Sequence, residues 1–220
     1  MKKLENLARN IITRPAVWVP DSVGDDLAKI VNHVIENEVH FLSVPNKFVE
    51  KIWAWVENKQ VKIFNRYDLV SDQYKDLSVF SGDISKGFRS GANGSQIFVD
   101  MQVLGFLAEG LAPIRDDLFF DKDFVVGIDI EKMSNDTWAN FFCLVKKLRP
   151  TAILITANGD KFDSKSDFVG RLSYMLEAWD TDAEIQIMFG KNNLRIIQTI
   201  RLIGIKRPSL ADKITVFTLD

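Results

Sequence analysis

The chain has 220 residues, of which 46% are hydrophobic, and a net charge of −2 at pH 7. That length is enough for one large core, since α/β barrels often exceed about 200 residues as a single domain. The charge offers no basic field for nucleic acid or an anionic membrane, and no apolar stretch reaches the roughly 18 residues of a membrane span. We therefore expect no nucleic-acid and no membrane partner. The amino-terminal residues lack the apolar core of a signal peptide, which predicts a cytoplasmic protein.

Short apolar runs alternate along the chain with segments of helical periodicity. The runs are rich in β-branched and aromatic residues, which favour strands. We predict eight strands, at residues 16–20, 39–45, 61–68, 95–100, 124–130, 152–157, 184–190 and 213–219.

Strands that are apolar on both faces and separated by helices are typical of a parallel sheet. Eight of them in series predict a closed (βα)8 barrel, the TIM-barrel fold. An open doubly wound sheet is the alternative, but it usually has fewer strands and often a glycine-rich turn after the first, which AVWVPDSVGDD lacks. No linker divides the chain, so residues 1–220 are predicted to form one domain.

The two ends of the chain carry further predictions. Leu4, Leu7, Ile11 and Ile12 are spaced as on one face of a helix, so residues 1–13 are predicted to form a helix that packs on the barrel. The chain stops directly after the eighth predicted strand, so we expect the final carboxy-terminal helix of the fold to be missing.

Several segments, in the same order, resemble the deoxyribose-phosphate aldolase-like branch of the class I aldolases. The resemblance extends over nearly the whole chain and implies a TIM barrel. The matching segments are VHFLSVPNKFVEKIWAWVENKQVKIFNRYD for the second and third strands, FRSGANGSQIFVD for the Gly-Ala-Asp-Glu fourth strand, RPTAILITANG for the Lys-Thr-Ser-Thr-Gly sixth strand and IQIMFGKNN for the seventh.

The resemblance also implies an imine mechanism, whose residues this chain lacks. Such aldolases use a lysine on the sixth strand as nucleophile, a second lysine on the seventh and an acid on the fourth. Those positions fall on Ile155, on Ile187 or Met188, and on Gln96. No catalytic residue is assigned, and no cofactor is implied. We expect Ile155 to project into the barrel interior against Gln96 and Ile187 or Met188.

Two functions follow from this loss. The first is a divergent aldolase-like protein, non-catalytic or catalytically altered, that binds a metabolite. The alternative is a carbon–carbon lyase of the aldolase type that acts on a small aldehyde or sugar phosphate with a relocated lysine, such as Lys132, Lys161 or Lys191. The sequence leaves open whether the chain is an enzyme.

Polar residues after the predicted strands are the candidate ligand-binding set, because barrel enzymes carry function at the carboxyl ends of their strands. They would recognise a small phosphorylated or carbonyl metabolite. The set is Asn65, Arg66, Asp100, Asp129, Lys132, Thr156, Asn158, Gly190 and Lys191.

No metal site is predicted. Asp68, Asp100, Asp129 and Glu131 could offer oxygen ligands to Mg²⁺, but the sequence shows no spacing that brings them together.

Two further residues carry local predictions. Cys143 follows Phe142 in a helical segment and is expected to be a packed core thiol, and as the single cysteine it excludes an internal disulfide. Trp55 is expected to be exposed, which is compatible with an interface in a homo-oligomer.

Overall fold

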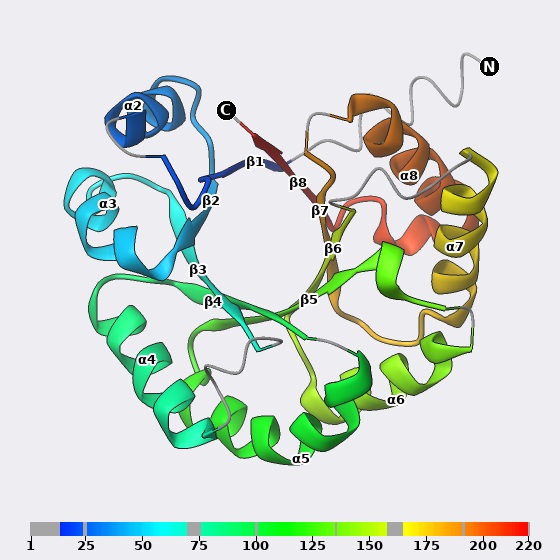
Figure 1. Cartoon of the computed structure of the whole chain (residues 1–220). Coiled ribbons are helices and arrows are strands. Elements are labelled where there is room, and N and C mark those ends of the chain that lie inside the picture. Colours follow the sequence, from blue (N-terminus) through cyan, green and yellow to red (C-terminus); the bar gives the residue numbers. More distant parts are fainter. Residues whose placement is uncertain are drawn as a thin grey trace.

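The computed structural model describes residues 14–23, 26–69, 76–99, 101–134, 136–157, 165–190 and 192–219. Eight parallel strands form one closed barrel in chain order, and β8 pairs with β1. Helices surround the ring of strands (Figure 1). The TIM-barrel prediction is confirmed, and the open-sheet alternative is wrong.

The strands agree with the eight predicted runs. They are β1 (Arg14–Trp18), β2 (Phe41–Pro45), β3 (Lys62–Asp68), β4 (Gly94–Phe98), β5 (Asp123–Asp129), β6 (Ala152–Thr156), β7 (Glu184–Met188) and β8 (Ile214–Leu219).

The outer layer contains seven α-helices among the described residues, together with three short 3-10 helices. The α-helices are α2 (Leu27–Glu36), α3 (Val49–Val56), α4 (Leu77–Arg89), α5 (Met101–Leu118), α6 (Thr137–Leu148), α7 (Lys165–Ala178) and α8 (Asn193–Lys206). The 3-10 helices are η2 (Asn46–Phe48), η4 (Ile130–Lys132) and η5 (Pro208–Leu210). No described helix is long and apolar enough to cross a membrane. The helix predicted for residues 1–13 lies outside the described residues.

Successive side chains of each strand point alternately to the helices and to the barrel interior. On β6, Ile153 and Ile155 pack in one cluster with Phe168 and other helix residues. Leu154 instead packs in the interior cluster that contains Phe64 and Phe217. The prediction that Ile155 projects into the barrel is therefore wrong, and the sequence-based register of this strand is displaced by one residue.

The strand register arranges the interior side chains in layers formed by alternate strands, as in other TIM barrels. The layer at the amino-terminal ends is charged. There Arg14 pairs with Glu184 at 2.8 Å, and Lys62 pairs with Asp123 at 2.9 Å. Above it the interior is mainly apolar and largely buried. The carboxyl ends of the strands are consequently separated from the amino-terminal face by a packed core.

Candidate functional site at the carboxyl ends of the strands

Arg66 is a charged group that β3 places inside the barrel near its carboxyl end. One guanidinium nitrogen donates to Val19 O at 2.6 Å and to Asp21 Oδ1 at 2.9 Å. The other donates to Ser43 O at 2.9 Å and to Ser43 Oγ at 3.2 Å. Its Cζ lies 4.0 Å from the centre of the Trp18 ring. Arg66 thereby ties the segment after β1 to β2 and β3.

The environment of Arg66 shifts its acidity. The side chain is only 8% exposed. Burial lowers the pKa of Arg66 from its ordinary value to about 10, and the hydrogen bond and charge of Asp21 oppose that shift. The guanidinium is nevertheless charged at neutral pH, and it is satisfied by acceptors within the protein.

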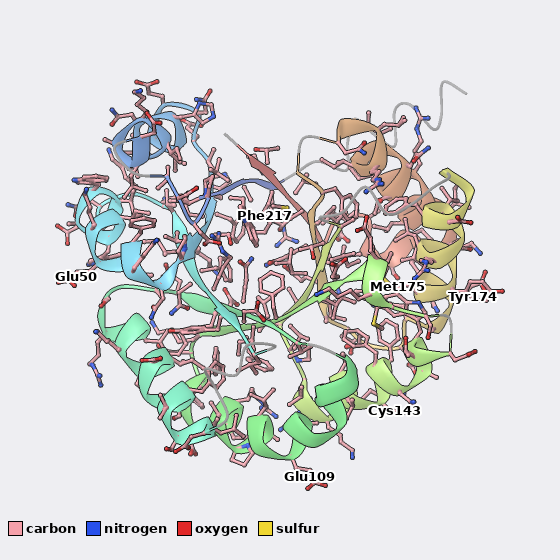
Figure 2. All side chains as sticks on the ribbon, viewed as in Figure 1. Glu50, Glu109, Cys143, Tyr174, Met175 and Phe217 are labelled. Atoms are coloured by element: carbon pink, nitrogen blue, oxygen red, sulfur yellow. The ribbon has the colours of Figure 1, made fainter. Side chains whose placement is uncertain are left out.

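Three aromatic rings fill the interior beside Arg66. The Trp18 ring meets Phe98 edge-to-face at 6.0 Å and Phe217 at 6.1 Å between centroids. Phe217 lies inside the ring of strands (Figure 2). A Cβ added to Gly127 would come within 2.8 Å of the Phe98 ring, so glycine gives this ring its space. We call Trp18, Phe98, Phe217 and Arg66 the plug.

Below the plug runs a chain of uncharged hydrogen bonds. Ser43 Oγ donates to Gln96 Oε1 at 2.5 Å, and Gln96 Nε2 donates to Gln186 Oε1 at 2.8 Å. The side chain of Gln96 therefore lies in the interior. Amide side chains neither gain nor lose a proton near neutral pH. These hydrogen bonds can therefore hold the side chains in position, but they offer no acid or base.

Asn65 lies on the opposite face of β3 and is not brought together with Arg66. Its side chain donates to Tyr67 Oη at 2.7 Å and accepts from Ser95 Oγ at 2.6 Å. A Cβ on Gly87 of α4 would lie 2.0 Å from Asn65 Nδ2, so this glycine lets α4 approach the strand. The network holds β3, β4 and α4 together.

The charged residues at the end of β5 and in η4 make separate contacts. The Asp129 carboxylate accepts from Glu131 N at 2.9 Å and caps η4. Glu131 pairs with Arg195 of α8 at 3.2 Å, with 5% of the Glu131 side chain exposed. Lys132 is exposed. The described residues contain no cluster of three or more ligands that could hold a metal ion.

Two of the remaining candidates, Thr156 and Gly190, are described, at the carboxyl ends of β6 and β7. The Thr156 hydroxyl is buried and donates to Ile128 O at 3.1 Å. Gly190 has φ of 59°, in the left-handed region that glycine favours. Asp100, Asn158, Lys161 and Lys191 lie outside the described residues.

The described strands contain a single lysine, Lys62, at the amino-terminal end of β3 and ion-paired with Asp123. It lies at the opposite end of the barrel from the plug. Two inward positions on β6, Leu154 and Thr156, carry no amine. An imine would therefore need a lysine from outside the strands.

Of the plug residues, Arg66 was among the candidates predicted from the sequence, whereas Trp18, Phe98 and Phe217 were missed, although they are visible as aromatic residues in the predicted strands. The location of Cys143 could have been predicted from the helical spacing of the neighbouring apolar residues. The buried face of α6 is formed by Trp138, Phe141, Phe142, Val145 and Leu148, and Cys143 is exposed (Figure 2). The prediction of a packed thiol is wrong. The predicted exposure of Trp55 is confirmed at 39%.

No family model matches the sequence, and no curated protein matches it. Solved structures do match the fold. A putative deoxyribose-phosphate aldolase from Toxoplasma gondii ME49 superimposes with a TM-score of 0.74 and 12% identity, over 99% of this chain and 91% of that one. The aldolase QR15 gives 0.71 and 14%, over 95% and 90%.

Two other structures show how far the likeness extends. Deoxyribose-phosphate aldolase from Aeropyrum pernix, described as a unique tetramer, gives a TM-score of 0.64 and 12% identity, over 98% and 88% of the two chains. The carboxyl transferase domain of Rhizobium etli pyruvate carboxylase gives 0.65 and 9%, over 99% and 42%. At identities this low, the superpositions show a shared fold. The fold is that of the deoxyribose-phosphate aldolases, as the sequence resemblance predicted.

Proposed function

We propose that this chain is a divergent aldolase-like barrel that binds a small phosphorylated or carbonyl metabolite without forming an imine. The observation that carries the proposal is the plug, which occupies the interior next to the carboxyl ends of the strands. A class I mechanism requires open space there and a lysine amine directed into it.

The polar groups beneath the plug support the same reading. Gln96 and Gln186 hydrogen-bond to each other, so neither is an unpaired group available to bind a substrate. Arg66 already donates to Val19, Asp21 and Ser43, which leaves it poorly placed to take a phosphate as its main partner. A ligand would bind above the plug, on the loops that follow the strands.

Loop cations are the groups that would recognise such a ligand. Lys132 is exposed at the end of η4, and Lys191 follows β7 in the sequence. An ammonium is a common phosphate ligand, and a metabolite bound by two of them would be anionic.

Reductive trapping tests the absence of imine chemistry. The full chain is treated with borohydride and a panel that includes acetaldehyde, glycolaldehyde and glyceraldehyde 3-phosphate, and intact masses are recorded beside a class I aldolase control. We expect the control to gain the mass of the reduced adduct and this chain to gain none. A stoichiometric adduct on one lysine, located by peptide mapping, would contradict the proposal.

Binding is tested separately, by the change in melting temperature and in the NMR spectrum on adding the same phosphorylated compounds. Lys132→Ala and Lys191→Ala should weaken any response, while Lys62→Ala at the opposite end of the barrel should leave it unchanged.

The alternative function is an aldolase with a relocated lysine. It is favoured by the aldolases among the structures that match nearly the whole chain. Under this alternative, the trapped adduct would form and would be lost in one of Lys132→Ala, Lys161→Ala or Lys191→Ala.

A further inference from the structure

One side of α8 carries apolar side chains that the described part of the chain leaves uncovered. Leu194, Ile197 and Ile205 are 48%, 42% and 62% exposed. At about 100° per residue they form one stripe along the helix, on the side away from the buried residues Ile196 and Ile203. We call Leu194, Ile197 and Ile205 the α8 stripe. Single exposed apolar residues are common, but three along one side of a helix indicate a partner that covers them.

The α8 stripe is displaced away from α7. The flank of α8 that meets α7 is marked by the ion pair of Lys206 with Glu177 and by Arg195, whose Cζ lies 5.4 Å from the centre of the Phe168 ring. Ile197 lies about half a turn round the helix from both Lys206 and Arg195. On that free side, no described α-helix lies between α8 and α2, outside the seam at which β8 pairs with β1 (Figure 1).

The outer surface of the β8–β1 seam is partly uncovered as well. Ala16 and Phe217 belong to the interior cluster, so the alternation along each strand directs Pro15 and Thr218 outward. Both Pro15 and Thr218 are exposed. The described helices therefore leave one free surface that is made of the side of α8 and the neighbouring seam.

Residues 1–13 fit this surface in attachment, length and pattern. They precede Arg14, where β1 begins, so they are joined to the chain at the amino-terminal end of the seam. As a helix they would be about 20 Å long, close to the length of the 14-residue α8. Leu4, Leu7 and Ile11 would share one face of that helix. The covalent link gives this segment a high effective concentration at the seam, an advantage that a second copy of the chain lacks.

One pair of opposite charges matches across the same surfaces. Arg201 lies beside the α8 stripe, is exposed and has no ion pair among the described residues. Glu5 is the single acidic residue of residues 1–13. In a helix Glu5 would lie beside Ile12, at the edge of the apolar face, where its carboxylate can reach a cation next to that face.

We propose that residues 1–13 form an amphipathic helix that lies between α8 and α2, with its apolar face on the α8 stripe and the β8–β1 seam. Glu5 then pairs with Arg201. The segment completes the outer layer of the barrel and stabilises α8 and β1. This contact is independent of the proposed function, because it lies on the outside of the barrel and not at the carboxyl ends of the strands.

Photocrosslinking in the full chain tests the location of the segment. The photoreactive p-benzoylphenylalanine replaces Leu7 in a mixture of isotopically heavy and light chains, and the products are mapped by mass spectrometry. We expect crosslinks to α8 within one chain. The matched control carries the same group in place of Asn6, on the opposite face of the helix, and should give no crosslink to α8. Crosslinks from position 7 between heavy and light chains, to other parts of the barrel only, or to nothing would overturn the proposal.

A double-mutant cycle tests the apolar contact. Leu7→Ser and Ile197→Ser should each lower the melting temperature by about 2–4 °C, and the double variant should lose less than their sum, because both substitutions remove the same contact. Asn6→Ser is the matched control and should leave the melting temperature unchanged. Strictly additive effects of Leu7→Ser and Ile197→Ser, or no effect of Leu7→Ser, would count against the docked helix.

Charge exchange tests the ion pair. Glu5→Arg and Arg201→Glu should each lower the melting temperature, and the double variant should recover most of the loss, because the reversed pair has the same geometry. The recovery should shrink in high salt, which screens an exposed pair. A double variant with the summed loss of the two single variants would overturn the placement of Glu5 against Arg201.

Discussion

Arg66 shows how a charged residue is accommodated within a largely apolar barrel. Burying an unpaired charge is strongly unfavourable, whereas a hydrogen-bonded one is tolerated. The planar guanidinium reaches Val19, Asp21 and Ser43 at once and stacks on Trp18. A lysine ammonium has no planar fork with which to reproduce this geometry.

We therefore predict that Arg66→Lys lowers the free energy of unfolding by about 1–3 kcal/mol, because carbonyl groups near the plug lose their donor. Asp21→Asn is the control and should cost less than about 1 kcal/mol, since the Asp21 side chain is 84% exposed. Urea denaturation measures both. Equal effects of the two substitutions would show that the ion pair, rather than the carbonyl contacts, stabilises this region.

The pKa of Arg66 sets the pH range of that measurement. Its folded value of about 10 lies below the ordinary value for an arginine in the unfolded chain. Below about pH 9 the group is charged in both the folded and unfolded states, so its contribution to stability is constant. Between the two values the unfolded state binds more protons, and this group makes stability rise with pH. The contribution of Arg66 itself should thus be the same at about pH 6 and pH 8, and a difference between wild type and Arg66→Lys that changes over this range would report titration of the new lysine.

At the scale of single elements, close approach of neighbouring atoms requires glycine at some positions of the strands and helices and not at others. A Cβ on Gly94, at the start of β4, would lie 2.6 Å from the backbone oxygen of Asp123 on β5. Gly82, in α4, has nothing within 4 Å of the same position. Both are glycines inside regular elements, but only Gly94 is required by packing.

We predict opposite effects of alanine at these two positions. Gly94→Ala should destabilise the protein by about 1–3 kcal/mol, because the strands must separate. Gly82→Ala should stabilise it by about 0.5–1 kcal/mol, because alanine favours the helix and restricts the unfolded chain. Thermal and urea denaturation measure both changes. A stabilising Gly94→Ala would contradict the register of β4 and β5.

For the whole molecule, the packing between strands and helices falls into two parts. One cluster joins β1 to β3 with α2 and α3, and a larger one joins β3 to β8 with α4 to α8. Phe88 is partly buried against both. The closed hydrogen-bonded ring connects the two, since β1 pairs with β2 and with β8.

We predict that native-state hydrogen exchange finds a lower opening free energy for amides of α2 and α3 than for those of α6 and β5 to β7. The smaller cluster buries fewer apolar side chains and can open while the larger one persists. Exchange measured by NMR or mass spectrometry at increasing denaturant checks this. A common opening free energy in both regions would show that barrel closure makes the molecule one cooperative unit.

The sequence by itself determined the number and order of the strands. Residues such as Val125 and Ile153 belong to runs that are apolar on both faces, which is typical of parallel strands covered by helices. That pattern was enough for the TIM barrel and for the resemblance to aldolases, and the superpositions agree with both.

Tertiary structure alone decided which face of each strand is inside. Because both faces of these strands are apolar, the sequence did not distinguish Leu154 from Ile155, and it assigned the interior to the wrong one. Asn65 and Arg66 are consecutive polar residues on one strand, yet Asn65 bonds to Asn46 of η2 in the outer layer, whereas Arg66 is part of the plug in the interior. The reason is the two-residue period of a strand: a shift of one residue exchanges every side chain between the two faces, and only strand pairing around the closed barrel fixes that register.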